Sequence, residues 1–360
     1  MNILLHYNLA LLQISGWRLT QENLEILLAN QEQIIIGNFS QLNLNKTQQK
    51  NLSLAQQQIP SKDFFEEQLT KNQIKTTSYF DSSYPKRLKE LFDPPLLLFY
   101  IGDLKILDHI SIAIVGNRKV SSYGKLIPDI LLKDFMCFKI TIISGLAYGI
   151  DTLSHQAALK YQLPTCAVLG GGLSDQNLYP KTNLSLAKQI IKNGGLLLSE
   201  YYPHNQARGY QFVARNRIIA ALSHLTVIAE CPQKSGALIT AQYAIELGKP
   251  TGAVPGSILT QQSRGSHQLL EQGAFPIINA QSIANILQLE LPNLSQSKPS
   301  VQLSQEAQAV LKCIQKSPST LDQIILQTQI SPQQILTAIT ELEINEMISN
   351  ASMGVYTSHV

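Results

Sequence analysis

The chain has 360 residues, of which 44% are hydrophobic and 15% are charged. This length predicts two or three domains, and the composition excludes a wholly disordered chain because core-forming residues are plentiful. No apolar run reaches the roughly 18 residues of a membrane span, and the start of the chain lacks the basic region of a signal peptide. We therefore expect a cytoplasmic protein.

Charge is unevenly distributed along the chain. The net charge is +3, but residues 111–280 carry 15 Lys and Arg against 8 Asp and Glu, whereas residues 301–360 carry 2 against 5. The middle segment is therefore the part that would attract a polyanion. A mildly basic enzyme surface is the alternative interpretation of these counts.

The first 80 residues are rich in Gln, Asn and Leu, with periodic apolar positions such as Leu5, Leu9 and Leu12. This pattern predicts a small helical domain over residues 1–80. Next, Tyr84-Pro85 is expected to open a helix that Pro94-Pro95 closes, and LLLFYIG is expected to form a short strand.

Seven apolar runs then follow at regular intervals and are typical of buried strands. They cover residues 110–116, 139–145, 164–170, 194–202, 225–231, 251–256 and 276–279. Helical stretches separate most of them, and such long crossovers imply parallel pairing. We therefore predict an α/β domain over residues 81–284, with an extended Rossmann-like, doubly wound and mainly parallel sheet.

The last part of the chain changes character again. Residues 285–303 contain prolines and serines and predict a linker. Beyond it, residues 304–316, 320–328 and 331–345 are expected to form helices, and two short strands are expected around Gly354. Residues 304–360 thus form a third predicted domain, with three helices and a β-wing.

Open parallel sheets bind ligands outside the carboxyl ends of their strands. The segments that follow the predicted strands combine Gly with Ser or a cation: 116–119, 144–147, 170–172, 199–200, 234–236, 255–257 and 263–266. Glycine permits close backbone approach, and hydroxyls and helix N-termini donate to phosphate oxygens. Repetition on one edge favours a phosphate-binding face over ordinary turns.

The first of these loops is not a dinucleotide-binding motif. Gly116 is followed by Asn117-Arg118, and Gly124 comes eight residues after Gly116, so the spacing is not GxGxxG. Arg118 instead places a permanent cation at the strand end, suited to a phosphate contact. The alternative for Arg118 is a surface salt bridge with Asp129 or Glu200.

The segment from Phe212 to Arg217 is expected to open a helix. Arg215 and Arg217 are two residues apart and point to different sides of it, so one can face a ligand while the other pairs internally. Aromatic residues interleave with these cations, and their rings would either stack on nucleic-acid bases or pack in the core. They are Tyr123, Tyr148, Tyr179, Tyr201, Tyr202, Tyr210 and Phe212.

Catalytic and metal motifs are absent from the sequence. Asp151 and His155 share a helix face, and Glu200 and Glu230 end strands, where they would act as bases or pair with arginines. The cysteines form no CxxC pair, and HExxH and GxSxG do not occur. We therefore predict a non-enzymatic protein with no catalytic residues, no metal and no cofactor.

Together, the runs IAIVGNRKVSSYG, IISGLAYGID, LGGGLSDQNLYPKTN, FVARNRIIAALS, KSGALITAQYAIELGKPTGAVPGSI and SRGSHQLLEQGA resemble the DNA-processing protein A family (DprA, also called Smf) over roughly residues 78–280. The resemblance implies a homodimer that binds single-stranded DNA. It also implies loading of the recombinase RecA with displacement of single-strand-binding protein, in DNA recombination, competence and natural transformation. It implies no hydrolytic activity.

The resemblance also carries a set of DNA-binding residues onto the strand-end loops. They are Gly116, Asn117, Arg118, Ser144, Gly145, Arg208, Phe212, Arg215, Asn216, Arg217, Lys234, Ser235, Gly236, Arg264 and Gly265. Four positions depart from the family pattern: Asn117 stands where Ser is usual, Tyr148 and Ala214 stand where Arg is common, and His267 stands where Asn is usual. The loss of two cations is expected to lower the salt dependence of binding.

The terminal domains depart from the family as well. Ile14-Ser15-Gly16-Trp17 replaces the Gly-x-Gly hairpin often found in the helical domain, which resembles SAM and helix-hairpin-helix modules, so we do not expect duplex binding there. Residues 304–360 resemble the family's winged-helix module. Its expected recognition helix, SPQQILTAITELEINE, has no Lys or Arg and three Glu, which predicts a protein-contact or dimer-modulating role.

Two other functions are alternatives to single-strand binding. The first is a nucleotide-processing enzyme related to the lysine-decarboxylase-like phosphoribohydrolases, but their PGGxGTxxE block is missing, and residues 234–240 read KSGALIT. The second is a pure protein-interaction scaffold, which does not explain the cations at the strand ends.

Overall fold

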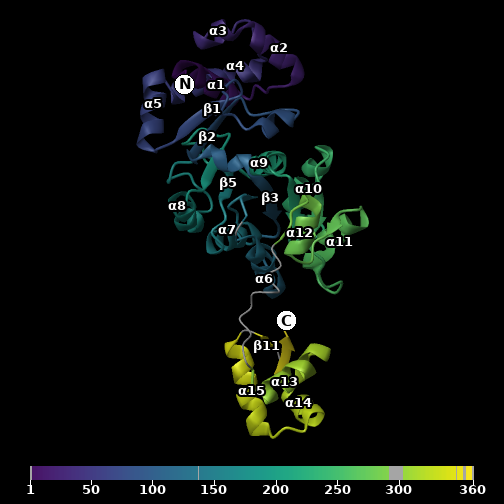
Figure 1. The fold of residues 1–360 in the computed structure, drawn as a ribbon. Coiled ribbons are helices and arrows are strands. Elements are labelled where there is room, and N and C mark those ends of the chain that lie inside the picture. The colour runs from purple at the N-terminus through teal and green to yellow at the C-terminus, as the bar shows by residue number, and fades with distance from the viewer. Residues whose placement is uncertain (1, 137, 292–302, 346, 352–353, 359–360) are drawn as a thin grey trace. The chain divides into compact units, whose positions relative to one another are not determined.

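The computed structural model describes residues 2–136, 138–291, 303–345, 347–351 and 354–358. The chain divides into two compact units, Met1–Leu291 and Pro292–Val360, which are treated separately below (Figure 1). No helix in these ranges is both long enough and apolar enough to cross a membrane.

Five helices open the first unit: α1 (Ile3–Ser15), α2 (Gln21–Ala29), α3 (Gln31–Ile35), α4 (Lys46–Gln58) and α5 (Lys62–Lys71). Local capping explains several of their starts. Asn45 and Gln48 form a reciprocal capping box at the start of α4, and Thr20 and Ser61 cap α2 and α5. The predicted helices of this segment are therefore present.

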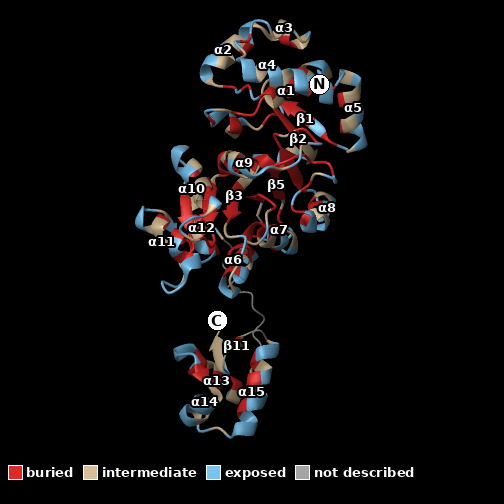
Figure 2. Ribbon diagram, turned by 180° about the vertical axis from the view of Figure 1, so that it is seen from behind, coloured by how far each residue is buried: buried red, intermediate tan, exposed pale blue. Residues whose placement is uncertain are grey.

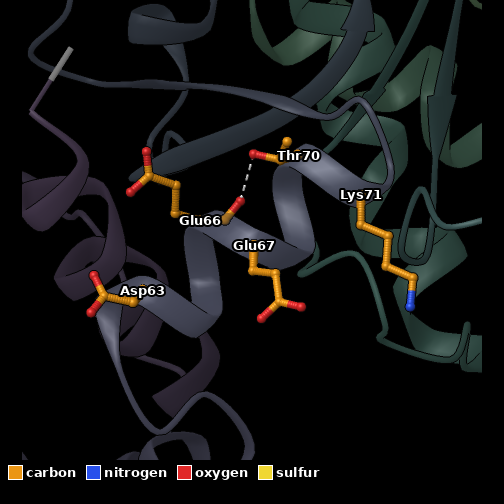
Figure 3. A pocket seen from close by; sticks show the side chains of 5 residues that line it. All are labelled: Asp63, Glu66, Glu67, Thr70 and Lys71. Atoms are coloured by element: carbon orange, nitrogen blue, oxygen red, sulfur yellow. Dashed lines mark hydrogen bonds between the residues drawn. The ribbon is translucent and has the colours of Figure 1, made fainter.

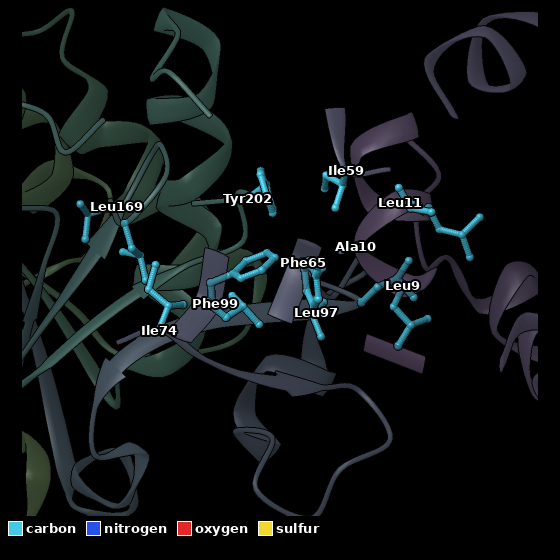
Figure 4. Packing of buried hydrophobic residues seen from close by; sticks show 14 of the residues in the cluster. Leu9, Ala10, Leu11, Ile59, Phe65, Ile74, Leu97, Phe99, Leu169 and Tyr202 are labelled. Carbon is cyan, nitrogen blue, oxygen red and sulfur yellow. The ribbon is translucent and has the colours of Figure 1, made fainter. Parts of the chain in front are cut away.

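These helices do not form a core of their own. Phe65 of α5 is fully buried, and its ring contacts the rings of Phe99 and Tyr202, which belong to the sheet region (Figure 4). One hydrophobic cluster therefore runs from α1 to the sheet. In addition, strand β1 (Lys75–Ser78) lies inside residues 1–80 but pairs with β2 (Leu97–Gly102). The prediction of a separate helical domain over 1–80 is corrected by this shared core.

The sheet has nine strands in the order β1-β2-β6-β5-β4-β3-β7-β8-β9. The others are β3 (Ile110–Val115), β4 (Ile140–Ser144), β5 (Thr165–Leu169), β6 (Leu196–Ser199), β7 (Leu225–Ile228), β8 (Thr251–Ala253) and β9 (Phe275–Pro276). In this order, the seven strands that begin with β6 and end with β9 all pair in parallel, as the seven apolar runs predict. β1 and β2 add an antiparallel edge. Figure 2 shows most of these strands in the colour of buried residues, whereas both residues of β9 are exposed.

Helices cover both faces of the sheet, as in a doubly wound fold. One face packs against α9 (Gly209–Leu222), α10 (Gly236–Glu246) and α11 (Arg264–Glu271). The other packs against α6 (Ser122–Leu132), α7 (Ile150–Lys160) and α12 (Ala280–Leu287), and α8 (Leu184–Lys192) packs beside α7. The predicted extended Rossmann-like fold class is confirmed.

Two local predictions differ from the structure. The helix expected after Pro85 is a single 3-10 turn, η1 (Lys86–Glu90), because Pro94 and Pro95 follow too closely for a longer helix. The expected linker also begins too early: α12 extends to Leu287, and Leu289 and Leu291 pack against the sheet-side cluster, since their apolar side chains gain from burial.

The second unit has the predicted arrangement of three helices and a wing. α13 (Gln305–Lys316), α14 (Leu321–Thr328) and α15 (Pro332–Ile344) enclose a small core, and β10 (Ser319–Thr320), β12 (Val355–Ser358) and β11 (Ile348–Ala351) form a three-stranded sheet in that order. Pro332 occupies the first turn of α15, where its missing N–H costs no hydrogen bond.

Candidate functional site

The carboxyl ends of the parallel strands meet at one edge of the sheet, which we call the strand-end edge. Exposed cations lie in the loops there: Arg118 and Lys119 after β3, Lys234 after β7, and Arg264 at the start of α11. Arg208, the N-cap residue of α9, is also exposed. Five predicted or adjacent cations therefore reach solvent at this edge.

The β3 loop is fixed by Glu230, which follows the neighbouring strand β7. The Asn117 backbone N–H donates to the Glu230 carbonyl at 2.7 Å, and the Glu230 carboxylate accepts from both the N–H and the hydroxyl of Ser121, at 3.0 and 2.5 Å. The Asn117 side chain closes the loop further by donating to the Lys119 carbonyl. Arg118 is thus presented from a loop tied at both ends.

Gly149 shows how closely the next loop approaches this one. Its φ is +79°, and a Cβ there would lie 2.2 Å from the Asn117 carbonyl oxygen. The N–H of Ile150, the first residue of α7, donates to the same carbonyl at 3.2 Å. Only glycine permits this approach without strain, so the β3 and β4 loops form one rigid surface.

Arg118 makes no ion pair in the described part of the chain. Its guanidinium carbon lies 5.5 Å from the centre of the Phe212 ring, a cation–π contact. The two carboxylates considered for it are engaged elsewhere, Asp129 with Lys160 at 2.7 Å and Glu200 with Arg217 at 2.7 Å. The salt-bridge interpretation of Arg118 is therefore wrong, and its charge remains available for a ligand.

Phe212 also belongs to a row of aromatic rings. Its ring centre lies 5.4 Å from that of Tyr179, and Tyr179 lies 6.3 Å from Tyr148. Tyr148 and Tyr179 are 41% and 45% exposed. The sequence names both as strand-end aromatics but does not bring them together, because they are 31 residues apart in the chain.

Arg215 lies inside the molecule. It is only 4% exposed, and its guanidinium donates to the carbonyls of Gly145 and Val168. Burial lowers the pKa of Arg215 to about 10, and the nearby Asp151 opposes this shift. Asp151 is also buried and accepts from the backbone N–H groups of Gly145 and Ala147. Arg215 therefore holds the loop after β4 from below.

Arg217 is also turned inward. It donates to the Glu200 carboxylate through both terminal nitrogens and to Asp93 at 3.1 Å, and its side chain is 11% exposed. Burial alone would lower the pKa of Arg217, but these two carboxylates raise it. Both arginines are therefore engaged within the protein, because α9 is packed on both of those sides, and a ligand contact by either stays a prediction.

Four other predicted residues are buried or used internally. Ser144 donates to the Ile114 carbonyl, and Asn216 donates to that of Gly236. The Gly145 N–H is held by Asp151, and the Gly265 N–H donates to the Cys231 carbonyl at 2.9 Å. Each of these groups already has a protein partner, so a direct contact with DNA through it would have to replace that hydrogen bond. They shape the edge.

The remaining predicted positions are half-buried or exposed. Gly116 is half-buried, since a Cβ would meet Ile150 and the Glu230 carbonyl. Ser235 caps α10 by accepting from the Ala237 N–H at 3.2 Å, next to exposed Gly236 and Lys234. A helix N-terminus with free N–H groups beside a cation suits a phosphate oxygen.

The candidate catalytic groups are occupied structurally. Glu200 pairs with Arg217, and Glu230 accepts from Ser121. His155 is fully buried against Thr165, and burial lowers its pKa to about 3. Across the residues with described positions, no group of three or more His, Cys, Asp or Glu side chains is placed to hold a metal ion.

Of two surface hollows, one lies outside the strand-end edge and the other reaches it at Arg208. One is a shallow face of α5 with Asp63, Glu66 and Glu67, where Thr70 donates to the Glu66 carbonyl (Figure 3). Three carboxylates there would repel phosphate. The other, of about 1430 Å³, lies between the N-terminal helices and the sheet and includes the Arg217 ion pairs.

The fold and this edge define a class of protein: a Rossmann-like α/β protein with a cationic, aromatic edge at the carboxyl ends of its strands. Comparison with known proteins places it further. A family model described as DNA recombination-mediator protein A matches residues 75–288, and one described as DprA winged helix domain matches residues 295–352. This chain belongs to the DNA recombination-mediator protein A family, DprA or Smf.

Relatives and solved structures agree with this assignment. DNA processing protein DprA of Streptococcus pneumoniae is 42% identical over 57% of this chain and 72% of the relative, and Protein Smf of Synechocystis sp. is 32% identical over 79% and 80%. The X-ray structure of the S. pneumoniae protein matches with a TM-score of 0.65 at 33% identity, covering 80% of this chain and 99% of that one.

A second solved structure concerns the single-stranded DNA binding mode of DNA processing protein A from Helicobacter pylori. It matches with a TM-score of 0.54 at 32% identity, covering 60% of this chain and 96% of that one. Membership of the family assigns this chain a role as a DNA-processing recombination mediator.

Proposed function

We propose that this protein binds single-stranded DNA along the strand-end edge and loads RecA onto it, without catalysing a reaction itself. The observation that carries the proposal is Arg118, an exposed cation on a rigid loop, stacked on Phe212 and free of any ion pair in the described ranges. Lys119, Lys234, Arg208 and Arg264 supply further phosphate contacts at the same edge.

The two kinds of predicted site residue have separate roles in this proposal. Exposed residues contact the DNA: the cations bind phosphates and Phe212 offers a ring to a base. Buried residues hold the loops in place, with Arg215 under the Gly145 loop and Arg217 fixing α9 to Glu200 and Asp93. The family relationship supports the ligand, since the related H. pylori structure concerns single-stranded DNA.

The binding step is tested by fluorescence anisotropy with labelled oligo-dT across a salt series, with excess unlabelled duplex present. Arg118→Ala should weaken binding and reduce the slope of log K against log salt by about 0.7, as expected for one lost phosphate contact on a single strand. Lys192→Ala is the matched control, because Lys192 is an exposed cation at the far end of α8. Equal effects of both variants would contradict the proposed site.

The mediator step is tested with RecA on DNA coated by single-strand-binding protein. The wild-type protein should restore RecA ATPase activity, and Arg118→Ala should not. Light scattering should give the mass of two chains, in keeping with a homodimer. We expect the protein to act in the cytoplasm, and cells that lack it should show less natural transformation. Oligo-dT binding without RecA stimulation would remove the loading step and leave the binding step standing.

A further inference from the structure

Three aromatic side chains from separate segments form one row on the strand-end edge. Phe212 lies in the first turn of α9, Tyr179 in the loop after β5, and Tyr148 in the loop after β4. Successive ring centres are 5.4 and 6.3 Å apart, and Arg118 lies over the Phe212 end. One helix and two loops are needed to build this row, so it is a product of the fold rather than of one local segment.

The row is not accounted for by core packing. Tyr148 and Tyr179 are 41% and 45% exposed, and among the described residues neither hydroxyl has a hydrogen-bond partner. Tyr123, at 47% exposure, differs, because its hydroxyl donates to the Pro255 carbonyl at 2.8 Å. Tyr148 and Tyr179 meet at 83°, and such an edge-to-face contact occupies only one of their four ring faces.

We propose that Phe212, Tyr179 and Tyr148 form a stacking track for successive unpaired DNA bases. The inference rests on the proposed function, because it states what the same edge contacts besides phosphate. On this inference, part of the binding free energy comes from base stacking and not from phosphate contacts. Such a track would favour single strands, since bases in a duplex already stack on one another.

The charges around the track fit a nucleic acid. Arg118 and Lys119 lie at its Phe212 end, and Lys181 follows Tyr179 by two residues and is exposed. Asp175, the acidic residue of the same loop, is paired with Lys188 at 2.8 Å. The Lys181 ammonium donates to the Asp175 carbonyl at 2.9 Å, so the cations that a strand on the rings would find for its phosphates are first Arg118 and Lys119.

The test compares oligo-dT with an oligomer of the same length that lacks bases. The wild-type protein should bind oligo-dT more tightly. Tyr148→Ala and Tyr179→Ala should each raise the Kd for oligo-dT about five-fold or more, and leave the Kd for the abasic oligomer unchanged. The salt slope should stay the same in both variants, because a ring neutralises no phosphate. Tyr148→Phe and Tyr179→Phe should bind like the wild type.

Tyr161→Ala is the matched control, since Tyr161 is a part-exposed tyrosine at the opposite end of α7. Equal binding of both oligomers by the wild type, or equal weakening of both by the tyrosine variants, would overturn the track. If the wild type bound neither oligomer, the proposed function would fall together with the track.

A second measurement uses only the wild-type protein. Photocrosslinking with 5-iodouracil-containing oligo-dT should join bases to peptides that contain Tyr148 and Tyr179, because this probe reacts with rings that stack on it. Crosslinks confined to other peptides would overturn the track even if the variants failed to fold.

Discussion

Arg217 is the residue whose role is most clearly structural. Its guanidinium lies between the carboxylates of Glu200 and Asp93, whose side chains are 10% and 16% exposed. Removing the cation leaves two carboxylates close together and poorly hydrated. Removing one partner of a buried ion pair leaves the other charge buried without a counter-ion, and this costs more than the intact pair contributes to stability. Arg217→Ala should therefore lower the free energy of unfolding by about 3 kcal/mol, measured by urea denaturation.

Arg18 provides the control for this prediction. It pairs with the same Asp93 at 2.9 Å, but its side chain is 71% exposed. An exposed pair contributes about 0–1 kcal/mol, so Arg18→Ala should change stability little. A similar loss in both variants would show that burial does not decide the strength of these pairs.

His155 predicts a dependence of stability on pH. Burial lowers its pKa to about 3, from an ordinary value of about 6.5. Between these values the unfolded chain binds a proton that the folded protein does not, so stability falls as the pH drops from 6.5. The cost of this one proton is about 1.4 kcal/mol per pH unit. Chemical denaturation at pH 7.5 and pH 5.0 measures it.

His155→Gln removes the titrating group and should make stability less dependent on pH over this range. Other groups keep part of the dependence, among them His6, whose pKa burial also lowers although Asp81 opposes the shift. A variant that is less stable by the same amount at both pH values does not confirm the prediction, because the slope of stability against pH must change. An unchanged slope would show that His155 titrates in the folded protein near its ordinary pKa.

The sequence predicts residue identity at the site better than residue orientation. Arg118, Lys234 and Arg264 are exposed, as a cationic edge requires. Arg215 and Arg217 are not exposed, because one side of α9 packs on the sheet and the other on the segment around Asp93. The sequence does not show this packing. Charge alone therefore does not distinguish a ligand contact from a buried support.

At the scale of elements, the parallel strands were predictable because each is apolar on both faces, which gives continuous runs such as ISIAIV. The antiparallel edge was harder to predict. β1 has the sequence KTTS, which is polar and short, and pairing with β2 buries it. Long-range pairing of this kind leaves no periodic signal in the strand itself.

Glu230 links two elements and tests how the β3 loop is held. Its carboxylate accepts from the N–H and the hydroxyl of Ser121, and it is 3% exposed. Glu230→Ala leaves the Ser121 N–H without its acceptor and should loosen the loop that presents Arg118. We expect oligo-dT binding to weaken several-fold by anisotropy, although removal of a negative charge near the site would by itself strengthen it.

The two effects have opposite signs, so the measurement separates them. Glu230→Gln also removes the charge but keeps an oxygen that accepts from Ser121, and it should bind as well as the wild type or better. Tighter binding by Glu230→Ala would show that the carboxylate acts on DNA only through its charge and does not position Arg118.

At the scale of the whole molecule, the two units have separate cores. The second is built around Val310, Ile324 and Ile339, all at most 3% exposed. The outward positions of α15 include Gln333, Leu336 at 50% and Ile344 at 76%, and none of its residues is Lys or Arg. Residues 301–360 carry 2 basic against 5 acidic side chains, which opposes binding to phosphate.

Binding to DNA should therefore depend on the first unit alone. A chain ending at Leu291 should bind oligo-dT within two-fold of the full-length affinity, with the same salt slope, because all the exposed strand-end cations lie before that residue. Residues 303–360 alone should not bind duplex DNA at physiological salt. A ten-fold loss on truncation, or duplex binding by the isolated unit, would instead assign DNA contacts to the Gln-rich start of α15, where amide groups would have to read bases without help from cations.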